Sequence, residues 1–223
     1  MAELFNQKFG IKEVADVAFY NQGDVKYDKS TGEVTTVAGK EPVLLFTTLK
    51  TSGLEFTGET TEARGGKGNA VLMSWDHSRE ATLTLEDALL SAKSLATMLS
   101  NDQAVLAGEN TVISINANGF PGTYTVVGKT YARGTDGKDH LLTFLIFKAK
   151  VSAEANLEMS ADGDPSTLNM TLKVLRCTND ANDLAMGAVD GDMVKLIIDD
   201  NTSTTAAGKT PTISFPGVTT TNA

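Results

Sequence analysis

The sequence predicts a mainly β domain with one helix and a long mobile loop between two of its strands. Residues 43–56 are rich in Val, Leu, Phe and Thr, which suit a pleated, half-buried surface. Residues 71–83 form the second strand, and residues 85–100 carry apolar side chains at helical spacing. Aromatic residues are only 6% of the chain, so the core must be built mainly from Val, Leu, Ile and Met.

A glycine-rich loop over residues 57–69 connects the two strands. Its far side, which we expect to form an inter-subunit contact, consists of Arg64, Gly65, Gly66, Lys67, Gly68 and Asn69. Glycine at this density disfavours a compact loop and favours one that is flexible or becomes ordered against a neighbouring subunit. A phosphate-binding loop would need glycine where Thr61 stands and Ser or Thr where Gly68 stands, so nucleotide binding is not predicted.

The second strand changes character along its length. Val71, Met73 and Trp75 alternate with polar residues, and farther on Ala81 and Leu83 alternate with Thr82 and Thr84. Neither face is apolar throughout, because polar His77 and Arg79 interrupt the apolar series. We therefore expect this strand to serve two different environments.

The predicted helix covers residues 85–100. Thr84 is a suitable N-cap, and Glu86 and Asp87 lie in the first turn, where the helix dipole favours negative charge. One apolar stripe runs through Leu85, Ala88, Leu89, Ala92, Leu95, Ala96 and Leu99. This pattern predicts a helix that lies on a sheet.

Six further strands are predicted after the helix. They cover residues 111–116, 123–131, 140–151, 157–160, 168–177 and 193–199. The apolar residues 141–147 predict burial on both faces, which requires the helix or a second sheet as cover. Residues 178–189 are expected to form a polar loop with one helical turn.

Three parts of the chain are distinguished: an N-terminal arm at 1–40, the β domain at 41–200 and a C-terminal extension at 201–223. Phe5, Phe9 and Phe19 have few ways to be buried within the arm, so they pack either on the main domain or on a neighbouring subunit. Residues 201–223 are rich in Thr, Gly and Ala and contain Phe215. They are expected to be disordered or held by a neighbour.

No catalytic, cofactor or metal site is predicted. Asp76, His77 and Ser78 are the residue types of a hydrolase triad, but adjacent strand residues point to opposite faces. His140 is expected to have a capping or surface role, and Cys177 to be a small buried apolar residue. Aspartate pairs begin at Asp162, Asp180 and Asp190, and counting from Asp162 and Asp180 does not give the spacing of an EF-hand, so these are interpreted as turn residues. One Trp and four Tyr give little support to a carbohydrate-active enzyme.

The overall composition narrows the classes of protein further. A formal net charge of −9 argues against a broad basic face for nucleic acid. A single cysteine excludes an internal disulfide framework and fits synthesis in a reducing cytoplasm. No apolar run approaches the ~20 residues of a membrane span, and no signal-peptide segment is expected at the N-terminus.

One part of the sequence resembles a known family. Arg64-Gly-Gly-Lys-Gly-Asn-Ala70, followed by Ser74-Trp75-Asp76, Arg79-Glu80 and residues 82–89, is similar to the major tail, or tail tube, proteins of bacteriophages. The resemblance implies an antiparallel β-sandwich or barrel flanked by one α-helix, with a long hairpin loop and extended terminal arms. It also implies a non-enzymatic virion protein that stacks in rings, which are hexameric in such tubes.

The same resemblance also implies the partners of the protein. They would be other copies of the chain and the tape-measure, terminator, baseplate and sheath proteins of the tail. DNA would pass through the tube during ejection without specific binding, and an acidic lumen would let it slide by charge repulsion. The protein would be made in the host bacterial cytoplasm and reside in the virion tail. A capsid-decorating or tail-completion β-sandwich is the alternative.

Overall fold

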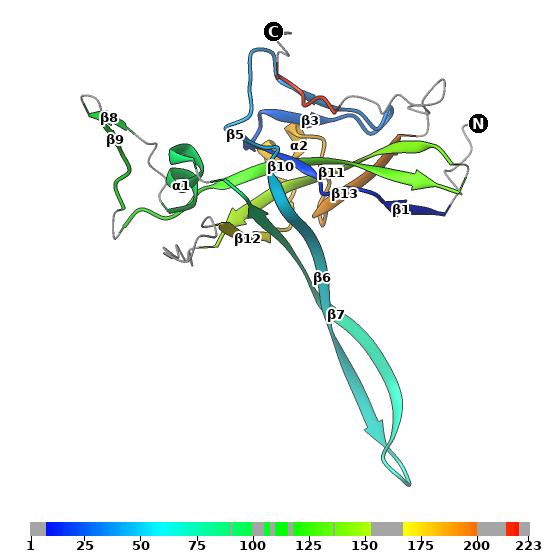
Figure 1. The fold of residues 1–223 in the computed structure, drawn as a ribbon. Coiled ribbons are helices and arrows are strands. Elements are labelled where there is room, and N and C mark those ends of the chain that lie inside the picture. The colour runs from blue at the N-terminus through cyan, green and yellow to red at the C-terminus, as the bar shows by residue number, and fades with distance from the viewer. Residues whose placement is uncertain are drawn as a thin grey trace.

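The computed structural model of the protein describes residues 8–89, 91–99, 105–107, 110–115, 118–135, 137–152, 167–199 and 213–218. It is mainly β, as the sequence predicts, and every strand pair in these ranges is antiparallel. Figure 1 shows a broad body from which one long two-stranded hairpin projects.

One nine-stranded sheet organises the body. Its main path is β5 (Leu44–Phe46), β2 (Asp16–Asn21), β10 (Thr123–Gly134), β11 (Asp139–Val151), β12 (Leu168–Val174), β7 (Ala70–Asp87) and β6 (Leu49–Gly65). Off this path, β1 (Phe9–Ile11) pairs with β10, and β13 (Val194–Asp199) pairs with β11. Two small hairpins, β3 (Val25–Tyr27) with β4 (Val34–Thr36) and β8 (Val105–Ala107) with β9 (Asn110–Val112), lie outside this sheet.

The central strands bury both of their faces. In β11, Phe144 and Ile146 belong to one hydrophobic cluster, whereas Leu145 and Phe147 belong to another. Because side chains alternate along a strand, the two clusters lie on opposite faces of the sheet. This confirms the prediction of two-sided burial for the most apolar strand.

Different elements cover the two faces. The first cluster includes β2, β5, β7, β12 and the helix α1 (Ala92–Leu99), which contributes Met98. The second cluster is closed by the β3–β4 hairpin, by residues that follow the short helix α2 (Ala181–Ala185), and by residues 213–218. The predicted helical turn within 178–189 is therefore present and caps a core.

A glycine allows the two longest strands of the body to pack. Gly128 of β10 lies directly opposite Phe144 of β11. A Cβ atom at Gly128 would fall inside the Phe144 ring, so the ring occupies the space above the glycine. An alanine there would force the aromatic side chain out of its place in the core.

The predicted start of the helix is wrong. Thr84 does not cap a helix, since β7 continues to Asp87 and pairs with β12 on one side and β6 on the other. Leu83 and Leu85 are buried while Thr84 is exposed, which is strand alternation. The side chain of Ser91 accepts a hydrogen bond from the Ser94 backbone N–H at 3.0 Å, and α1 begins after it.

The described parts of both terminal segments belong to the body. β2 lies between β5 and β10, and the Tyr20 hydroxyl donates a hydrogen bond to the Pro216 carbonyl at 2.8 Å. A Cβ at Gly217 would strike the Lys40 carbonyl, so residues 213–218 lie directly on the N-terminal segment. These pieces pack on their own chain, whereas the boundaries drawn at 40 and 200 stay predictions.

The remaining predicted strands fall into three groups. Those at 123–131, 140–151, 168–177 and 193–199 correspond to β10, β11, β12 and β13. The strand expected at 111–116 is reduced to the short β9. The strand expected at 157–160 lies outside the described residues.

Candidate assembly interface

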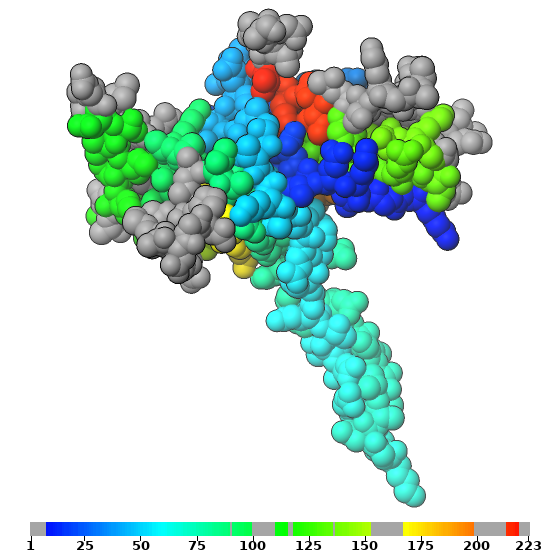
Figure 2. Space-filling model, in the orientation of Figure 1, coloured from blue at the N-terminus to red at the C-terminus, as the bar shows by residue number. Residues whose placement is uncertain are grey.

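The hairpin of β6 and β7 is the most exposed part of the described chain. All residues from 55 to 80 are exposed except Gly65, which is half-buried. Figure 2 shows this segment standing clear of the body along its outer length. We call residues 57–80 the ribbon.

The prediction of a mobile loop over residues 57–69 is wrong, because most of these residues are paired strand within the ribbon. Strand pairing continues to Gly65 and Ala70, so only residues 66–69 form the connecting turn. Gly66, Gly68 and Asn69 have positive φ angles of 78°, 92° and 51°, which suits glycine and asparagine in a tight turn. The glycines at 65–68 therefore build the tip of a long strand pair.

One face of the ribbon is apolar. Thr61 pairs with Trp75 and Ala63 pairs with Met73, and residues paired across two strands share a face. Trp75 is 48% exposed and Met73 is 64% exposed. We call these four residues the outer apolar face.

Over the same length, the opposite face of the ribbon is polar. Thr60 pairs with Asp76 and Glu62 pairs with Ser74. The Thr60 hydroxyl donates to the Asp76 carboxylate at 2.6 Å, and the Arg64 Nε donates to Glu62 at 2.9 Å. The side chains of the polar face thus satisfy one another through these hydrogen bonds and the Arg64–Glu62 ion pair. The outer apolar face has no cover in the described part of the chain.

A bulge separates the ribbon from the body. Thr57 pairs with Glu80 and Glu59 with His77, so Ser78 and Arg79 together oppose a single residue, Gly58. Ser78 has a φ of +54°, which is uncommon for a residue other than glycine. The extra residue exchanges the two faces of β7 at this point.

This exchange explains the two environments expected for the second strand. Before the bulge, Leu54, Ala81 and Leu83 turn toward the core, whereas Phe56, which pairs with Ala81 on the same face, is 46% exposed. Beyond it, the apolar residues Trp75 and Met73 lie on the other face.

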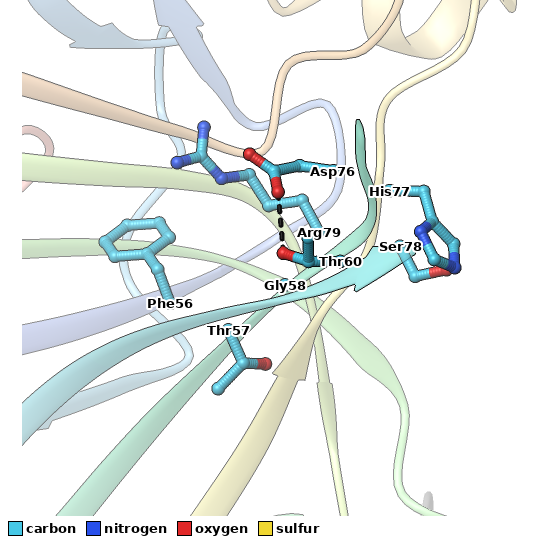
Figure 3. A pocket seen from close by; sticks show the side chains of 8 residues that line it. All are labelled: Phe56, Thr57, Gly58, Thr60, Asp76, His77, Ser78 and Arg79. Carbon is cyan, nitrogen blue, oxygen red and sulfur yellow. Dashed lines mark hydrogen bonds between the residues drawn. The ribbon is translucent and has the colours of Figure 1, made fainter. Parts of the chain in front are cut away.

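A cavity of 640 Å³ lies beside the bulge, and Figure 3 shows the side chains around it. Asp76 and Thr60 are hydrogen-bonded on one side of the ribbon, whereas His77 and Ser78 lie on the other. The His77 Nε2 lies 3.4 Å from a Glu59 carboxylate oxygen. Asp76 thus lies apart from His77 and Ser78, which the bulge brings to one side although simple alternation predicts opposite faces for them.

The predicted aromatic arm contacts separate into two kinds. Phe9 is 42% exposed, and its contact with another subunit stays a prediction, while Phe5 lies outside the described residues. Phe19 is fully buried between Phe46 and Tyr124, with ring centroids 5.5 and 5.9 Å away, so the prediction that it contacts another subunit must be corrected. Phe215 is also buried in its own chain, 5.7 Å below the Lys129 ammonium group.

Two residues considered for chemistry are buried. His140 is 1% exposed in β11, so a surface role is wrong for it. Cys177 is fully buried, as predicted. Burial, and then the nearby Asp183 carboxylate, raise the pKa of the Cys177 thiol to about 12.

This environment predicts an unreactive thiol. At pH 8 we expect iodoacetamide to leave Cys177 of the folded protein unmodified, because the thiolate form is both rare and inaccessible. The same reagent should modify the protein fully in denaturant. Intact-mass spectrometry checks both results, and modification of the folded protein at the rate of a free thiol would contradict the buried position.

A second apolar surface lies on the body. It is a groove of 540 Å³ where β1, β13 and the foot of β6 meet over β10 and β11. Its rim carries Phe9, Ile11, Val14, Phe56 and Leu196, which are 41–65% exposed, and Leu142 and Phe144 line its floor. We call this surface the groove. It was not predicted from the sequence, because its residues come from six strands and the loop after β1.

The chain with this architecture matches a known protein family. The model of the YomU/Tube protein family, a phage tail tube-type family, matches residues 9–108 and 106–188. The chain belongs to this family. The matched residues of this YomU/Tube protein contain the whole ribbon and the sheet from β1 to β12.

Membership identifies the chain as a phage tail component of the tube type, from a structural family rather than an enzyme family. A search of curated proteins found no match to this YomU/Tube protein. Among the described residues, no helix has the length and apolar character needed to span a membrane.

Proposed function

We propose that the protein assembles with copies of itself into stacked hexameric rings that form the phage tail tube. The tube conducts the genome during ejection, and the tape-measure, terminator, baseplate and sheath proteins are its other partners. Family membership supports the tube, and the exposed ribbon supports self-association.

The uncovered outer apolar face is the observation that carries this proposal. An isolated two-stranded hairpin is at best marginally stable in water, and three strands or a packed face are normally needed. Here Trp75 and Met73 stand exposed, on paired strands that project from the body. Docking on another subunit would remove this apolar surface from water and order the ribbon.

The net charge is consistent with DNA that passes through the tube without binding to it. With a formal charge of −9, the protein carries more carboxylates than basic groups, and DNA phosphates are repelled by excess negative charge. A lumen with this balance lets DNA move without specific contacts. The proposal requires no catalytic group.

A shortened ribbon tests the proposal. Residues 61–75 are replaced by Asn-Gly, so that the Thr60–Asp76 pair flanks a two-residue turn. We expect a folded protein that no longer forms tubes, because the deleted residues are exposed, apart from half-buried Gly65, and contribute nothing to either core cluster. Circular dichroism reports the fold, and negative-stain electron microscopy of concentrated protein reports tubes.

Ser74→Ala is the matched control, since it changes only the polar face of the same ribbon and should leave assembly intact. Long tubes with unchanged ring stacking in the shortened variant would refute the role of the ribbon. A wild-type protein that remains monomeric at high concentration would instead favour a capsid-decorating or tail-completion protein.

A further inference from the structure

We propose that the groove of one copy receives the outer apolar face of a second copy, with Trp75 and Met73 entering it. This inference rests on the proposed self-assembly and identifies the two surfaces that meet. Figures 1 and 2 show that the ribbon stands away from the body that carries the groove.

The groove has the character of a receiving site for large apolar side chains. Exposed Ile11 and Leu196, at 65% and 60%, flank a floor of buried Leu142 and Phe144. Its volume of 540 Å³ lies within the ~300–1,000 Å³ of typical ligand pockets. Several apolar side chains are therefore already arranged around a hollow that one aromatic anchor and its neighbour can enter.

The ribbon supplies the side chains that such a site recognises. Tryptophan is among the residues most often found to dominate binding energy at interfaces, and methionine adapts to irregular apolar surfaces. Trp75 and Met73 lie two residues apart on one face of β7. Both side chains can therefore contact the same surface of a partner.

A ribbon cannot fill the groove of its own copy. Phe56 at the foot of the ribbon lines the groove, and Ala63 lies seven residues farther out, a distance of about 23 Å at the rise of a β-strand. The bulge also turns Trp75 and Met73 to the face opposite Phe56. The occupant is therefore the ribbon of another copy.

The two surfaces differ, so their contact is head-to-tail. Such heterologous contacts propagate from copy to copy and produce rings or open helical arrays, unlike the self-complementary patch of a two-fold dimer. This is the kind of contact that a stacked tube needs.

Cross-linking between copies tests the docking directly. A Met73→Cys protein is mixed with a Leu196→Cys protein under tube-forming conditions and treated with a short bismaleimide. We expect a cross-linked dimer that contains one chain of each kind, while each variant alone gives none. Buried Cys177 does not contribute, and the untreated wild-type chain checks this.

Ser74→Cys replaces Met73→Cys in the matched control, because Ser74 lies on the polar face beside it. That mixture should give little product. In addition, Trp75→Ala should raise the protein concentration needed for tubes by at least about 30-fold, the equivalent of an interface hot spot.

The outcomes separate this inference from the proposed function. Tubes without a 73–196 cross-link would overturn the docking site and leave the tube intact. Equal cross-linking through residues 73 and 74 would overturn the assigned face. Absence of any self-association by the wild-type protein would overturn both proposals, and a cross-link of Leu196→Cys to a different tail protein would assign the groove to that partner.

Discussion

A Phe19→Ala variant should lose about 3–5 kcal/mol of the free energy of unfolding, the usual cost of emptying a buried aromatic site. Phe19 is fully buried in the central part of the sheet and packs against Phe46 and Tyr124. Urea denaturation of the shortened-ribbon protein measures the loss, since that background is expected to stay monomeric.

Phe9→Ala is the informative control for this prediction. Phe9 is 42% exposed at the rim of the groove, so its truncation should change the stability of the monomer by less than about 0.5 kcal/mol. It should instead weaken tube formation in the full-length protein. Equal destabilisation by the two substitutions would contradict the different positions of these phenylalanines.

An Asp183→Ala variant should lose a similar amount of stability, about 3–5 kcal/mol, because it removes one member of a buried ion pair. The Asp183 side chain is fully buried and accepts hydrogen bonds from Lys148 Nζ at 2.8 Å and from the Thr178 backbone N–H at 2.6 Å. Without Asp183, Lys148 of β11 and the backbone of Thr178 lose a buried acceptor. Thermal and urea unfolding measure the effect.

Asp180 provides the control from the same network. Its carboxylate is 47% exposed and caps α2 by accepting from the backbone N–H groups of Asn182 and Asp183, so Asp180→Ala should destabilise less than Asp183→Ala. The backbone hydrogen bond from Asp183, followed by the hydrogen bond from Lys148, lowers the pKa of Asp180 from 3.8 to about 2.

The lowered pKa also sets a pH dependence. A carboxyl group with a depressed folded-state pKa adds stability above its unfolded pKa and loses it as pH falls through the folded value. The difference in stability between the wild type and Asp180→Ala should therefore shrink between about pH 4 and pH 2. A larger destabilisation by Asp180→Ala than by Asp183→Ala would contradict the assigned roles.

The core strands could be predicted because their signals are local. The run of apolar residues in β11 cannot be placed with one face in water, and the turn residues around β10 bound it clearly. The start of the helix could not be predicted in this way. Thr84, Glu86 and Asp87 have the composition of a helix N-terminus, but pairing with β12 and β6 outweighs that weak preference.

The β6 half of the ribbon was not predicted as strand, for the opposite reason, whereas its β7 half was. Residues 57–65 combine glycine, threonine and glutamate, which have no apolar alternation to indicate strand. Their strand conformation comes from hydrogen bonds to β7. The groove gave no signal at all, because Ile11, Phe56 and Leu196 become neighbours only when distant elements meet in the sheet.

Because of the bulge at Gly58 and Ser78, the face on which Trp75 and Met73 lie depends on the strand register as well as on the residue types. At its present length, a β7 without the bulge would pair in simple alternation and turn Trp75 and Met73 to the side now held by Asp76. Losing the extra residue together with the bulge would instead keep the Thr61–Trp75 and Ala63–Met73 pairs as they are. The outer apolar face therefore tolerates a shorter β7 at this point, but not a slip of the strand register by one residue.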